Sequence, residues 1–227
     1  MIRSRDNEKV KLVRKLHERR WRDKLGLFFV EGEDLVEAAL DRGFEQVELL
    51  IAGGNVESAL LAEVSTLGHP PRVIGVFRKR ESAERGGVAL ALWHVSDPGN
   101  VGALVRSADA FGAGVMLSEG CADPFGPKAL RAAMGSTFRV PFPDFDLRDA
   151  VALVAEGGEP LEALDLGRYS TIVLGSEREG LPDELLERCE ARATIRVESV
   201  ESLNVAMAGT IALYERAVRS RRSRRRR

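Results

Sequence analysis

Apolar residues recur along the first eighty residues in short runs separated by polar or glycine-rich stretches. Val10, Val13 and Leu16 stand at helical spacing, which predicts a helix over 7–20. The pattern also predicts strands over 27–30, 47–51 and 72–77, and helices over 31–40 and 58–67. These elements together favour a small α/β domain.

Beyond residue 88 the pattern changes to longer apolar runs that alternate with amphipathic stretches. Val88 to Val95 is almost unbroken in apolar character, which is typical of a strand buried on both faces of a parallel sheet. We predict further strands over 115–117, 137–140, 171–174 and 193–197, and helices over 101–111, 128–134 and 202–219. Repeated strand–helix alternation indicates a parallel sheet with helices on both faces.

A polar stretch over 78–87, ending in two glycines, separates the two patterns. It predicts an N-terminal domain over 1–82, a second domain over 88–219 and a basic tail over 220–227. Both domain sizes are ordinary for proteins.

The net charge of −1 hides a strong asymmetry. Residues 1–25 carry ten lysines and arginines against four acidic residues, and residues 216–227 carry eight arginines and no acidic residue. Two basic ends on an acidic body favour contact with a polyanion, although the same charges could simply be solvated. Such contacts provide affinity without sequence information.

The sequence also argues against a membrane-spanning or secreted protein. No window approaches the ~20 consecutive apolar residues of a membrane span, and the N-terminus lacks the apolar region of a signal peptide. We therefore expect a soluble cytoplasmic protein without a membrane partner. Two isolated cysteines and three scattered histidines predict reduced thiols and no metal site.

Three stretches of the chain suggest known enzyme motifs but do not match them. Gly99-Asn100-Val101-Gly102 lacks the third glycine of a dinucleotide-binding fingerprint. The stretch from Gly120 to Lys128 has the wrong glycine spacing for a phosphate loop, and Gly175-Ser176-Glu177 is not a nucleophile elbow.

Three polar clusters follow predicted strands: 97–102 with Arg106, 175–182 and 201–205. Ligands of open α/β sheets bind outside the carboxyl ends of the strands, so these clusters are candidate site residues. Helix capping would explain Asp97, Ser202 or Asn204 taken singly.

The ordered motifs D-P-G-N-V-G-x-x-x-R, G-S-E-x-x-G-L and S-L-N-V-A resemble those of the SpoU-type (TrmH-like) RNA 2′-O-ribose methyltransferases of the SPOUT superfamily, over roughly 88–219. Cys121 to Phe125 and Arg131 to Ser136 also match that family's usual text. Phe29 to Val36 resembles the start of the family's N-terminal RNA substrate-binding domain.

The resemblance implies a catalytic domain with a deep trefoil knot, S-adenosylmethionine as cofactor, no metal and a homodimer with RNA as partner. It implies rRNA as substrate in preference to tRNA. The implied adenosine-binding positions are Gly175, Ile195 and Leu203. The implied functional polar positions are Asn100, Arg106, Glu177, Ser202 and Asn204.

An arginine, with a pKa of roughly 12.5–13.8, is a poor general base near neutrality. We therefore expect Arg106 to stabilise the developing alkoxide and hold the neighbouring phosphate. Ser202 and Asn204 would position Arg106 or the ribose, and Asn100 and Glu177 would orient the motif loops. As an alternative, Glu177 would cap the helix after Pro182.

The chain departs from the family after Ile195, where residues 196–199 differ and the run is one residue shorter. Two other functions stay open, and this departure favours only the second of them. One is a base methyltransferase of the same superfamily, and the other is a non-catalytic RNA-binding or assembly factor that keeps the fold.

Overall fold

The computed structural model describes residues 1–80, 86–199 and 202–224, with side chains described as far as residue 219. Parts of three predicted features lie outside the described residues: residues 81–85 of the domain boundary, Glu201 of the third cluster and residues 225–227 of the tail. The chain forms two compact units, each of which combines two segments. The first unit is Met1–Glu81 with Asp123–Arg139, and the second is Ser82–Ala122 with Val140–Arg227.

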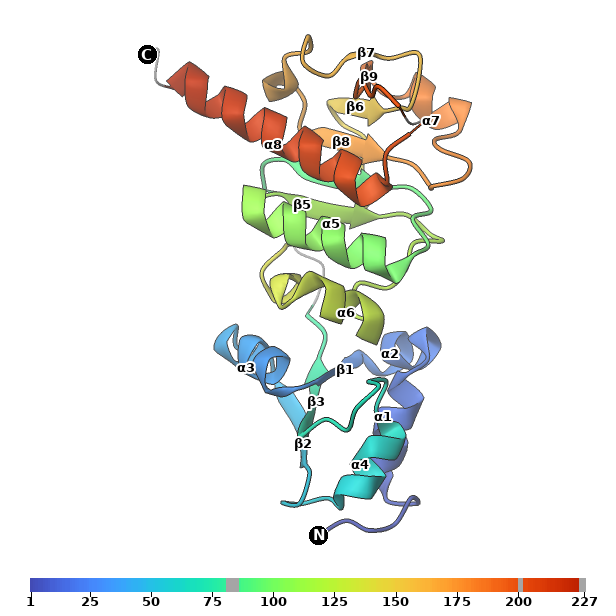
Figure 1. Cartoon of the computed structure of the whole chain (residues 1–227), viewed down its shortest axis with the longest axis vertical. Coiled ribbons are helices and arrows are strands. Elements are labelled where there is room, and N and C mark those ends of the chain that lie inside the picture. The colour runs from blue at the N-terminus through green and yellow to red at the C-terminus, as the bar shows by residue number, and fades with distance from the viewer. Residues whose placement is uncertain (81–85, 200–201, 225–227) are drawn as a thin grey trace. The chain divides into compact units, whose positions relative to one another are not determined.

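The first unit is built on an antiparallel sheet of order β1-β3-β2 (Figure 1). Its strands are β1 (Leu27–Glu31), β2 (Gln46–Ile51) and β3 (Val73–Arg78). Its helices are α1 (Glu8–Leu16), α2 (Arg19–Leu25), α3 (Glu33–Asp41), α4 (Ser58–Val64) and α6 (Pro127–Ala133), followed by the 3₁₀ turn η1 (Ser136–Phe138).

Two separate cores form in this unit, and β1 contributes to both because all five of its residues are buried. Val10, Val13 and Leu16 of α1 join the first core, with α4 and alternate strand residues. The second core is aromatic: Phe28 packs against Phe138 and other rings, together with side chains of α3 and α6. Residues 123–139 are therefore packed as part of the first unit.

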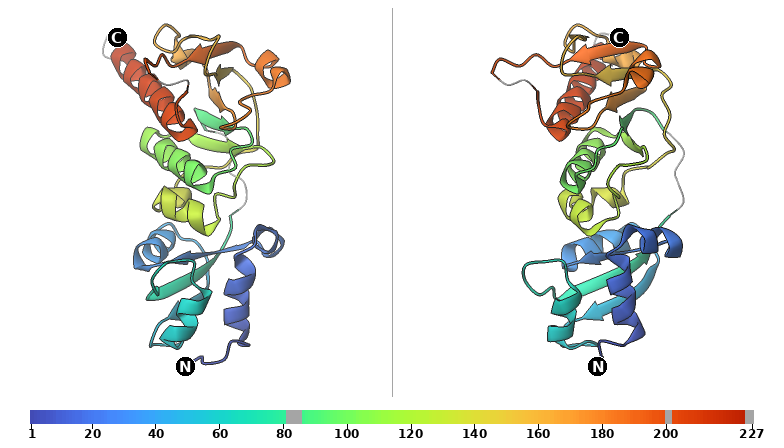
Figure 2. Two further views of the ribbon diagram at one scale, coloured as in Figure 1. Left: turned by 45° about the vertical axis from the view of Figure 1, so that its right-hand side comes forward. Right: turned by 90° about the vertical axis from the view of Figure 1, so that its right-hand side faces the viewer.

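The second unit contains a six-stranded sheet of order β5-β4-β8-β6-β9-β7, in which every neighbouring pair is parallel. Its strands are β4 (Ala89–Leu92), β5 (Gly114–Leu117), β6 (Ala150–Leu153), β7 (Glu159–Pro160), β8 (Thr171–Leu174) and β9 (Ala191–Thr194). Its helices are α5 (Pro98–Phe111), α7 (Asp183–Glu187) and α8 (Val205–Arg224), with the 3₁₀ turn η2 (Leu166–Arg168). Figure 2 shows α8 lying alongside α5 in both views.

The contact between α5 and α8 depends on a glycine. A Cβ on Gly209 would lie 2.5 Å from Leu104 Cδ2 and 2.7 Å from Leu174 Cδ1. Gly209 therefore lets α8 approach α5 and β8 closely, at the usual cost of a glycine within a helix. The side chains of Ser107 and Thr210 add a hydrogen bond of 2.6 Å between the two helices.

The parallel α/β sheet confirms the predicted fold class, and several local predictions need correction. The predicted strand over 137–140 is wrong. Met134 and Gly135 have positive φ angles of 48° and 82° and turn the chain into η1. Phe138 then joins the aromatic core, and this tertiary packing overrides the local strand preference. The threaded knot remains a prediction.

The predicted and observed helix boundaries differ most near the N-terminus. The single helix predicted over 7–20 is two helices, because the chain is extended at Glu18, with φ −93° and ψ 132°. The predicted helix over 58–67 ends at Val64, and the last helix starts at Val205 rather than at 202. Strands β6 and β7 were not predicted.

Candidate functional site

The candidate site lies at the carboxyl ends of β4 and β8. These strands are neighbours, but the chain leaves β4 toward β5 on one side and leaves β8 toward β9 on the other. Such a reversal is a topological switch point, where open α/β sheets bind their ligands. The second predicted cluster follows β8 directly, and the first begins shortly after β4, at Asp97.

Asp97 starts the helix that carries the first cluster. Its carboxylate accepts a hydrogen bond from the Asn100 backbone N–H at 3.0 Å, and Pro98 occupies the first turn. Both features are those expected of a helix N-terminus. They fix Asn100 in the first turn of α5, so its side chain lies beside the end of β8.

Asn100 joins all three clusters. Its Nδ2 donates to Glu177 Oε1 at 2.5 Å, and its Oδ1 accepts from Asn204 Nδ2 at 3.0 Å. The three residues are far apart in sequence, so only the folded sheet brings them together. Glu177 accepts from Asn100, and the residue at the N-cap position of α7 is Pro182, which makes no side-chain capping bond. The capping alternative for Glu177 is therefore wrong.

The second cluster is a tight loop. Ser176 and Gly180 exchange backbone hydrogen bonds of 3.2 and 3.1 Å, and Ser176 Oγ accepts from the Glu179 N–H at 3.2 Å. A Cβ on Gly175 would lie 2.3 Å from the Gly180 carbonyl carbon. Glycine is therefore required at 175 for the loop to close on itself.

Asn204 also begins α8. Its Oδ1 accepts from the backbone N–H groups of Ala206 and Met207 at 2.9 and 3.3 Å. Its two side-chain atoms thus perform separate tasks, because Oδ1 caps the helix and Nδ2 reaches Asn100. Capping and assembly of the site are both functions of this one residue.

Two predicted residues are not part of this cluster. Arg106 is exposed on α5, six residues beyond Asn100 and therefore about 9 Å along the helix axis. Its guanidinium makes no hydrogen bond or ion pair with any residue that the structure describes. Ser202 is exposed just before α8 and likewise has no such partner among the described residues. Arg106 is accordingly available to an incoming ligand.

The predicted cofactor positions fit an adenosine held by backbone and apolar contacts. Gly175 follows β8, Ile195 follows β9, and both strands end at the same edge because the sheet is parallel. Ile195 and Leu203 are half-buried, which leaves apolar surface on each for a ring. The divergent segment after Ile195 is exposed, and Arg196 Nε lies 3.7 Å from Glu162 Oε1.

The structure adds an aromatic pair that the sequence pattern did not indicate. The backbone N–H of Trp93 donates to the backbone carbonyl of Leu174 at 2.8 Å, which ties the end of β4 to the end of β8. The exposed His94 ring stacks on Trp93 at 4.5 Å, and its φ is +53°. Positive φ in a residue other than glycine is uncommon and concentrates at functional sites. Such a φ has no clear signature in sequence.

The cysteines are not candidate nucleophiles. Cys121 is buried and donates to the Leu92 carbonyl at 3.2 Å. Burial raises the pKa of the Cys189 thiol, outweighing the opposing effect of Arg188 and Arg192. Neither Cys121 nor Cys189 forms a disulfide, as predicted. Within residues 1–80, 86–199 and 202–224, no cluster of metal-ligating side chains occurs, and no described helix is long and apolar enough to cross a membrane.

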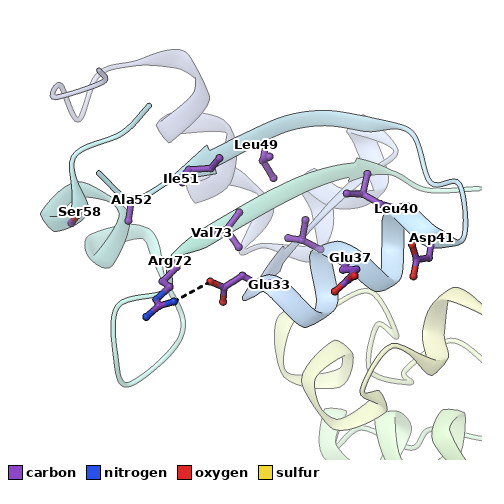
Figure 3. Close-up of a pocket in the computed structure, with 11 residues that line it drawn as sticks. Glu33, Glu37, Leu40, Asp41, Leu49, Ile51, Ala52, Ser58, Arg72 and Val73 are labelled. Carbon is purple, nitrogen blue, oxygen red and sulfur yellow. Dashed lines mark ion pairs between the residues drawn. The ribbon is translucent and has the colours of Figure 1, made fainter. Parts of the chain in front are cut away.

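A groove of about 710 Å³ in the first unit contains none of the predicted site residues (Figure 3). It lies where α3 leaves part of the sheet uncovered, with Leu49 and Val73 from the strands and Leu40 from the helix. Glu37 and Asp41 line its helical wall. It is an acidic and apolar groove, unlike the polar cluster around Asn100.

Comparison with known families agrees with this geometry. The SpoU rRNA methylase family matches residues 87–214, more than half of the chain. The MRM3-like substrate-binding domain matches residues 7–76. The chain belongs to the SpoU rRNA methylase family. The predicted family is thus confirmed, and all three clusters fall within the SpoU match.

Two curated SpoU relatives extend over nearly the whole chain. The 23S rRNA (guanosine(2553)-2′-O)-methyltransferase RlmP of Bacillus subtilis is 32% identical, covering 94% of this chain and 97% of that protein. The 23S rRNA (uridine(2479)-2′-O)-methyltransferase of Streptomyces viridochromogenes is 29% identical, covering 91% of this chain and 87% of that protein.

Solved structures of SpoU methyltransferases are also similar to nearly the whole chain. The AdoMet-bound rRNA methyltransferase from Sinorhizobium meliloti superimposes with a TM-score of 0.84 at 30% identity, covering 96% of this chain and 97% of that one. The SpoU methyltransferase AviRb from Streptomyces viridochromogenes, in complex with AdoMet, gives a TM-score of 0.85 at 25% identity, covering 96% and 99%.

Proposed function

We propose that this protein transfers a methyl group from S-adenosylmethionine to a ribose 2′-hydroxyl of large-subunit ribosomal RNA. The observation that carries the proposal is the side chain of Asn100, which joins the three SpoU motifs through Glu177 and Asn204. The 23S rRNA 2′-O-methyltransferases that match nearly the whole chain support the substrate class.

Bound S-adenosylmethionine supplies a methyl group already activated by its sulfonium. The protein must therefore align the 2′-hydroxyl with that methyl and stabilise the charge that develops on the oxygen, and alignment alone lowers such barriers greatly. Gly175, Ile195 and Leu203 hold the adenosine through the backbone of the second loop and two apolar side chains. With the donor bound, the apolar side chains of Ile195 and Leu203 would exclude water from its adenine ring.

Arg106 acts on the attacking oxygen. Its guanidinium, which has no described partner in the protein, donates to the developing alkoxide and to the adjacent phosphate. Arginine is too basic to accept the proton, so the proton leaves to solvent as the alkoxide is stabilised. Ser202, exposed before α8, donates to the ribose.

The Asn100–Glu177–Asn204 cluster has a positioning role. It holds the loop after β8, which begins with Gly175, against the N-terminal ends of α5 and α8. Arg106 lies further along α5, and Ser202 and Leu203 stand just before α8. Glu177 is not the general base in this scheme, because the amide of Asn100 already engages its carboxylate at 2.5 Å.

We propose that the active form is a homodimer in the cytoplasm. Met207, Ile211 and Tyr214 are 61, 39 and 57% exposed and follow one another at helical spacing on α8, so they form one apolar stripe. A solvent-exposed stripe of this kind is suited to burial against a second copy. Arg106 lies on α5, the helix that packs against α8, so a partner there would complete the surroundings of its guanidinium.

The test is transfer of labelled methyl from S-adenosylmethionine to unmodified ribosomal RNA, comparing wild type with Arg106→Ala. We expect label in one large-subunit RNA with wild type only, and resistance of the modified position to alkaline cleavage, which requires a free 2′-hydroxyl. Label on a base would make the protein a base methyltransferase. Donor binding without transfer to free RNA or to immature ribosomal particles would make it a binding factor.

A further inference from the structure

The first unit carries an aromatic ring surrounded by cations. Trp21, on α2, is partly buried. Lys15 Nζ, Arg20 Cζ and Lys24 Nζ lie 5.4, 5.6 and 5.2 Å from its ring centroid. Three cations share one indole, which concentrates positive charge around a flat π surface.

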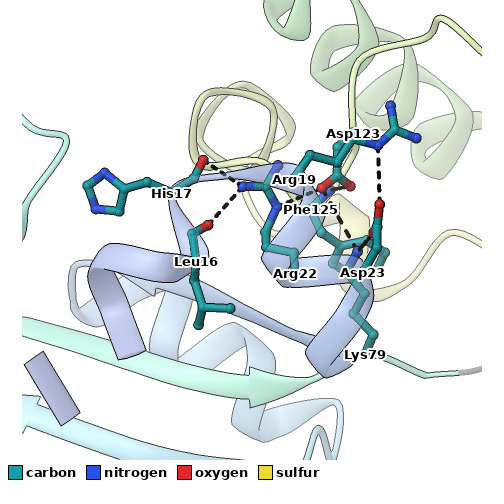
Figure 4. Close-up of polar contacts among 8 residues, drawn as sticks. All are labelled: Leu16, His17, Arg19, Arg22, Asp23, Lys79, Asp123 and Phe125. Carbon is teal, nitrogen blue, oxygen red and sulfur yellow. Dashed lines mark hydrogen bonds and ion pairs between the residues drawn. The ribbon is translucent and has the colours of Figure 1, made fainter. Parts of the chain in front are cut away.

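The next residue fixes this arrangement in place (Figure 4). Arg22 is buried, with Nε 2.7 Å from Asp123 Oδ2, and its Nη1 donates to the carbonyls of Leu16 and His17 at 2.8 and 2.9 Å. Those carbonyls end α1, so Arg22 locks the turn between α1 and α2. Trp21 thus lies on a helix whose orientation against α1 is fixed by Arg22, rather than on a loop.

The cations exceed the acids beside them. Arg20 pairs with Glu18 at 2.6 Å, while Asp23 is engaged by Lys79 at 2.7 Å. Burial works to raise the pKa of Asp23, but the hydrogen bond and charge of Lys79 outweigh it and keep that pKa below its usual value. Lys15 and Lys24 form no ion pair with the residues that the structure describes, so two ammonium groups are free for an anion.

We propose that Trp21 is a stacking platform for a base of single-stranded RNA, with Lys15, Arg20 and Lys24 contacting the phosphates on either side. The proposal rests on the proposed function and locates the face of the protein that holds the RNA. Single-stranded nucleic acid offers alternating flat bases and phosphates, which is the pattern of this surface. Duplex RNA buries its bases, and an acidic peptide offers no ring to stack.

Binding exchanges weak contacts for stronger ones. A cation over an exposed aromatic ring is only weakly attracted. Each lysine therefore moves readily from the ring to a phosphate, and the base takes the vacated face. Replacing an aromatic platform by alanine typically weakens single-strand binding at least about fivefold per base. Each lost phosphate contact lowers the dependence of log K on log salt by about 0.7.

The experiment measures binding of fluorescein-labelled oligo(U) to the full chain by anisotropy at several salt concentrations. We expect Trp21→Ala to weaken binding at least about fivefold and Trp21→Phe to restore most of it. The triple variant Lys15→Gln, Arg20→Gln, Lys24→Gln should flatten the salt dependence by about 2 units. A matched triple variant, Arg42→Gln, Arg72→Gln, Arg78→Gln, removes the same charge from exposed positions of the same unit.

A second readout reports stacking directly. The chain has two tryptophans, so Trp93→Phe isolates the emission of Trp21, which oligo(U) should quench and an oligo(U)·oligo(A) duplex should not. Equal binding by wild type and Trp21→Ala, or equal loss in both triple variants, would overturn the proposal. Quenching by oligo(U) without methyl transfer to any RNA would support the platform and reject the proposed function. If Trp21→Ala left methyl transfer at limiting RNA unchanged, the stacking platform would be rejected and the proposed function kept.

Discussion

The side chain of Asn204 donates a hydrogen bond from Nδ2 to Oδ1 of Asn100, 104 residues earlier in the chain, at 3.0 Å. Because Asn100 also donates to Glu177, the amide group is oriented from both sides. An amide carries its donor and its acceptor on two different atoms, so it reaches the carboxylate and the second amide at once, whereas a carboxylate cannot donate and a hydroxyl has one oxygen for both contacts. The site therefore specifies asparagine at position 100 rather than a polar residue in general.

Asn100→Asp should destabilise the protein by about 1–2 kcal/mol, because the new carboxylate faces Glu177 with no proton to donate. Urea unfolding of the full chain measures the change, and calorimetry with S-adenosylmethionine should show weaker binding. Asn7→Asp is the matched control. Asn7 caps α1 by accepting from the Lys9 N–H, a task aspartate performs equally well. Equal effects of the two substitutions would reject the positioning role of Asn100.

Arg106→Lys should leave stability within about 0.5 kcal/mol of wild type, because the exposed side chain has no described partner to lose. The kcat for methyl transfer should fall at least about tenfold, since an ammonium cannot contact the alkoxide and phosphate with a planar fork. Rapid-quench single turnover at saturating donor separates this effect from binding. Arg188→Lys, also exposed, serves as control. Normal turnover by Arg106→Lys would show that only the positive charge matters.

Gly175→Ala should open the loop after β8. The added Cβ would meet the Gly180 carbonyl carbon and the Leu181 nitrogen at 2.3 and 2.7 Å, and backbone cannot move aside as a side-chain end can. We expect a loss of about 1–3 kcal/mol and a large drop in donor affinity by calorimetry. Gly68→Ala, where the Cβ meets nothing within 4 Å, should change neither. Unchanged donor affinity in Gly175→Ala would place the adenosine elsewhere.

The sequence was sufficient for elements with strong local patterns. The strand over 171–174 was predicted correctly, because an apolar run followed by glycine and polar residues leaves few alternatives. Strand β6 (Ala150–Leu153) was missed, since alanine has little strand preference and four residues show no periodicity. Its strand state comes from pairing with β8 and β9, which no local window contains.

Long-range contacts explain the remaining gaps. Nothing near Asp123 in sequence indicates that residues 123–139 belong with the first unit, since the deciding contacts are to Arg22 and Phe28. Each cluster was predicted to follow a strand, but the direct bonds of Asn100 depend on side-chain directions that spacing does not determine. The positive φ of His94 is also set by its surroundings, where Gly120 leaves room for the ring.

Ile211→Lys should convert a dimer into a monomer. The substitution places a charge in the middle of the exposed stripe on α8, where burial against a second copy would cost several kcal/mol. Light scattering after gel filtration measures the mass, and the stability of the monomer should be unchanged. Leu40→Lys, on an exposed leucine of the first unit, is the matched control and should remain dimeric. A wild-type protein that is monomeric at high concentration would contradict the proposed assembly.

Asp123→Asn should be among the most destabilising conservative substitutions in the chain, by about 3 kcal/mol. The Arg22 and Asp123 side chains are only 5 and 7% exposed, so neutralising the carboxylate leaves a buried guanidinium without its counter-charge. Asp146→Asn breaks an ion pair with Arg148, whose side chain is 76% exposed. This substitution should cost less than about 1 kcal/mol of stability. Urea unfolding compares the two. Combining Asp123→Leu with Arg22→Met should recover stability relative to either single change, because apolar side chains of similar volume tolerate burial. If the double variant were as unstable as the sum of its parts, the hydrogen bonds from Arg22 to Leu16 and His17 would be the larger contribution.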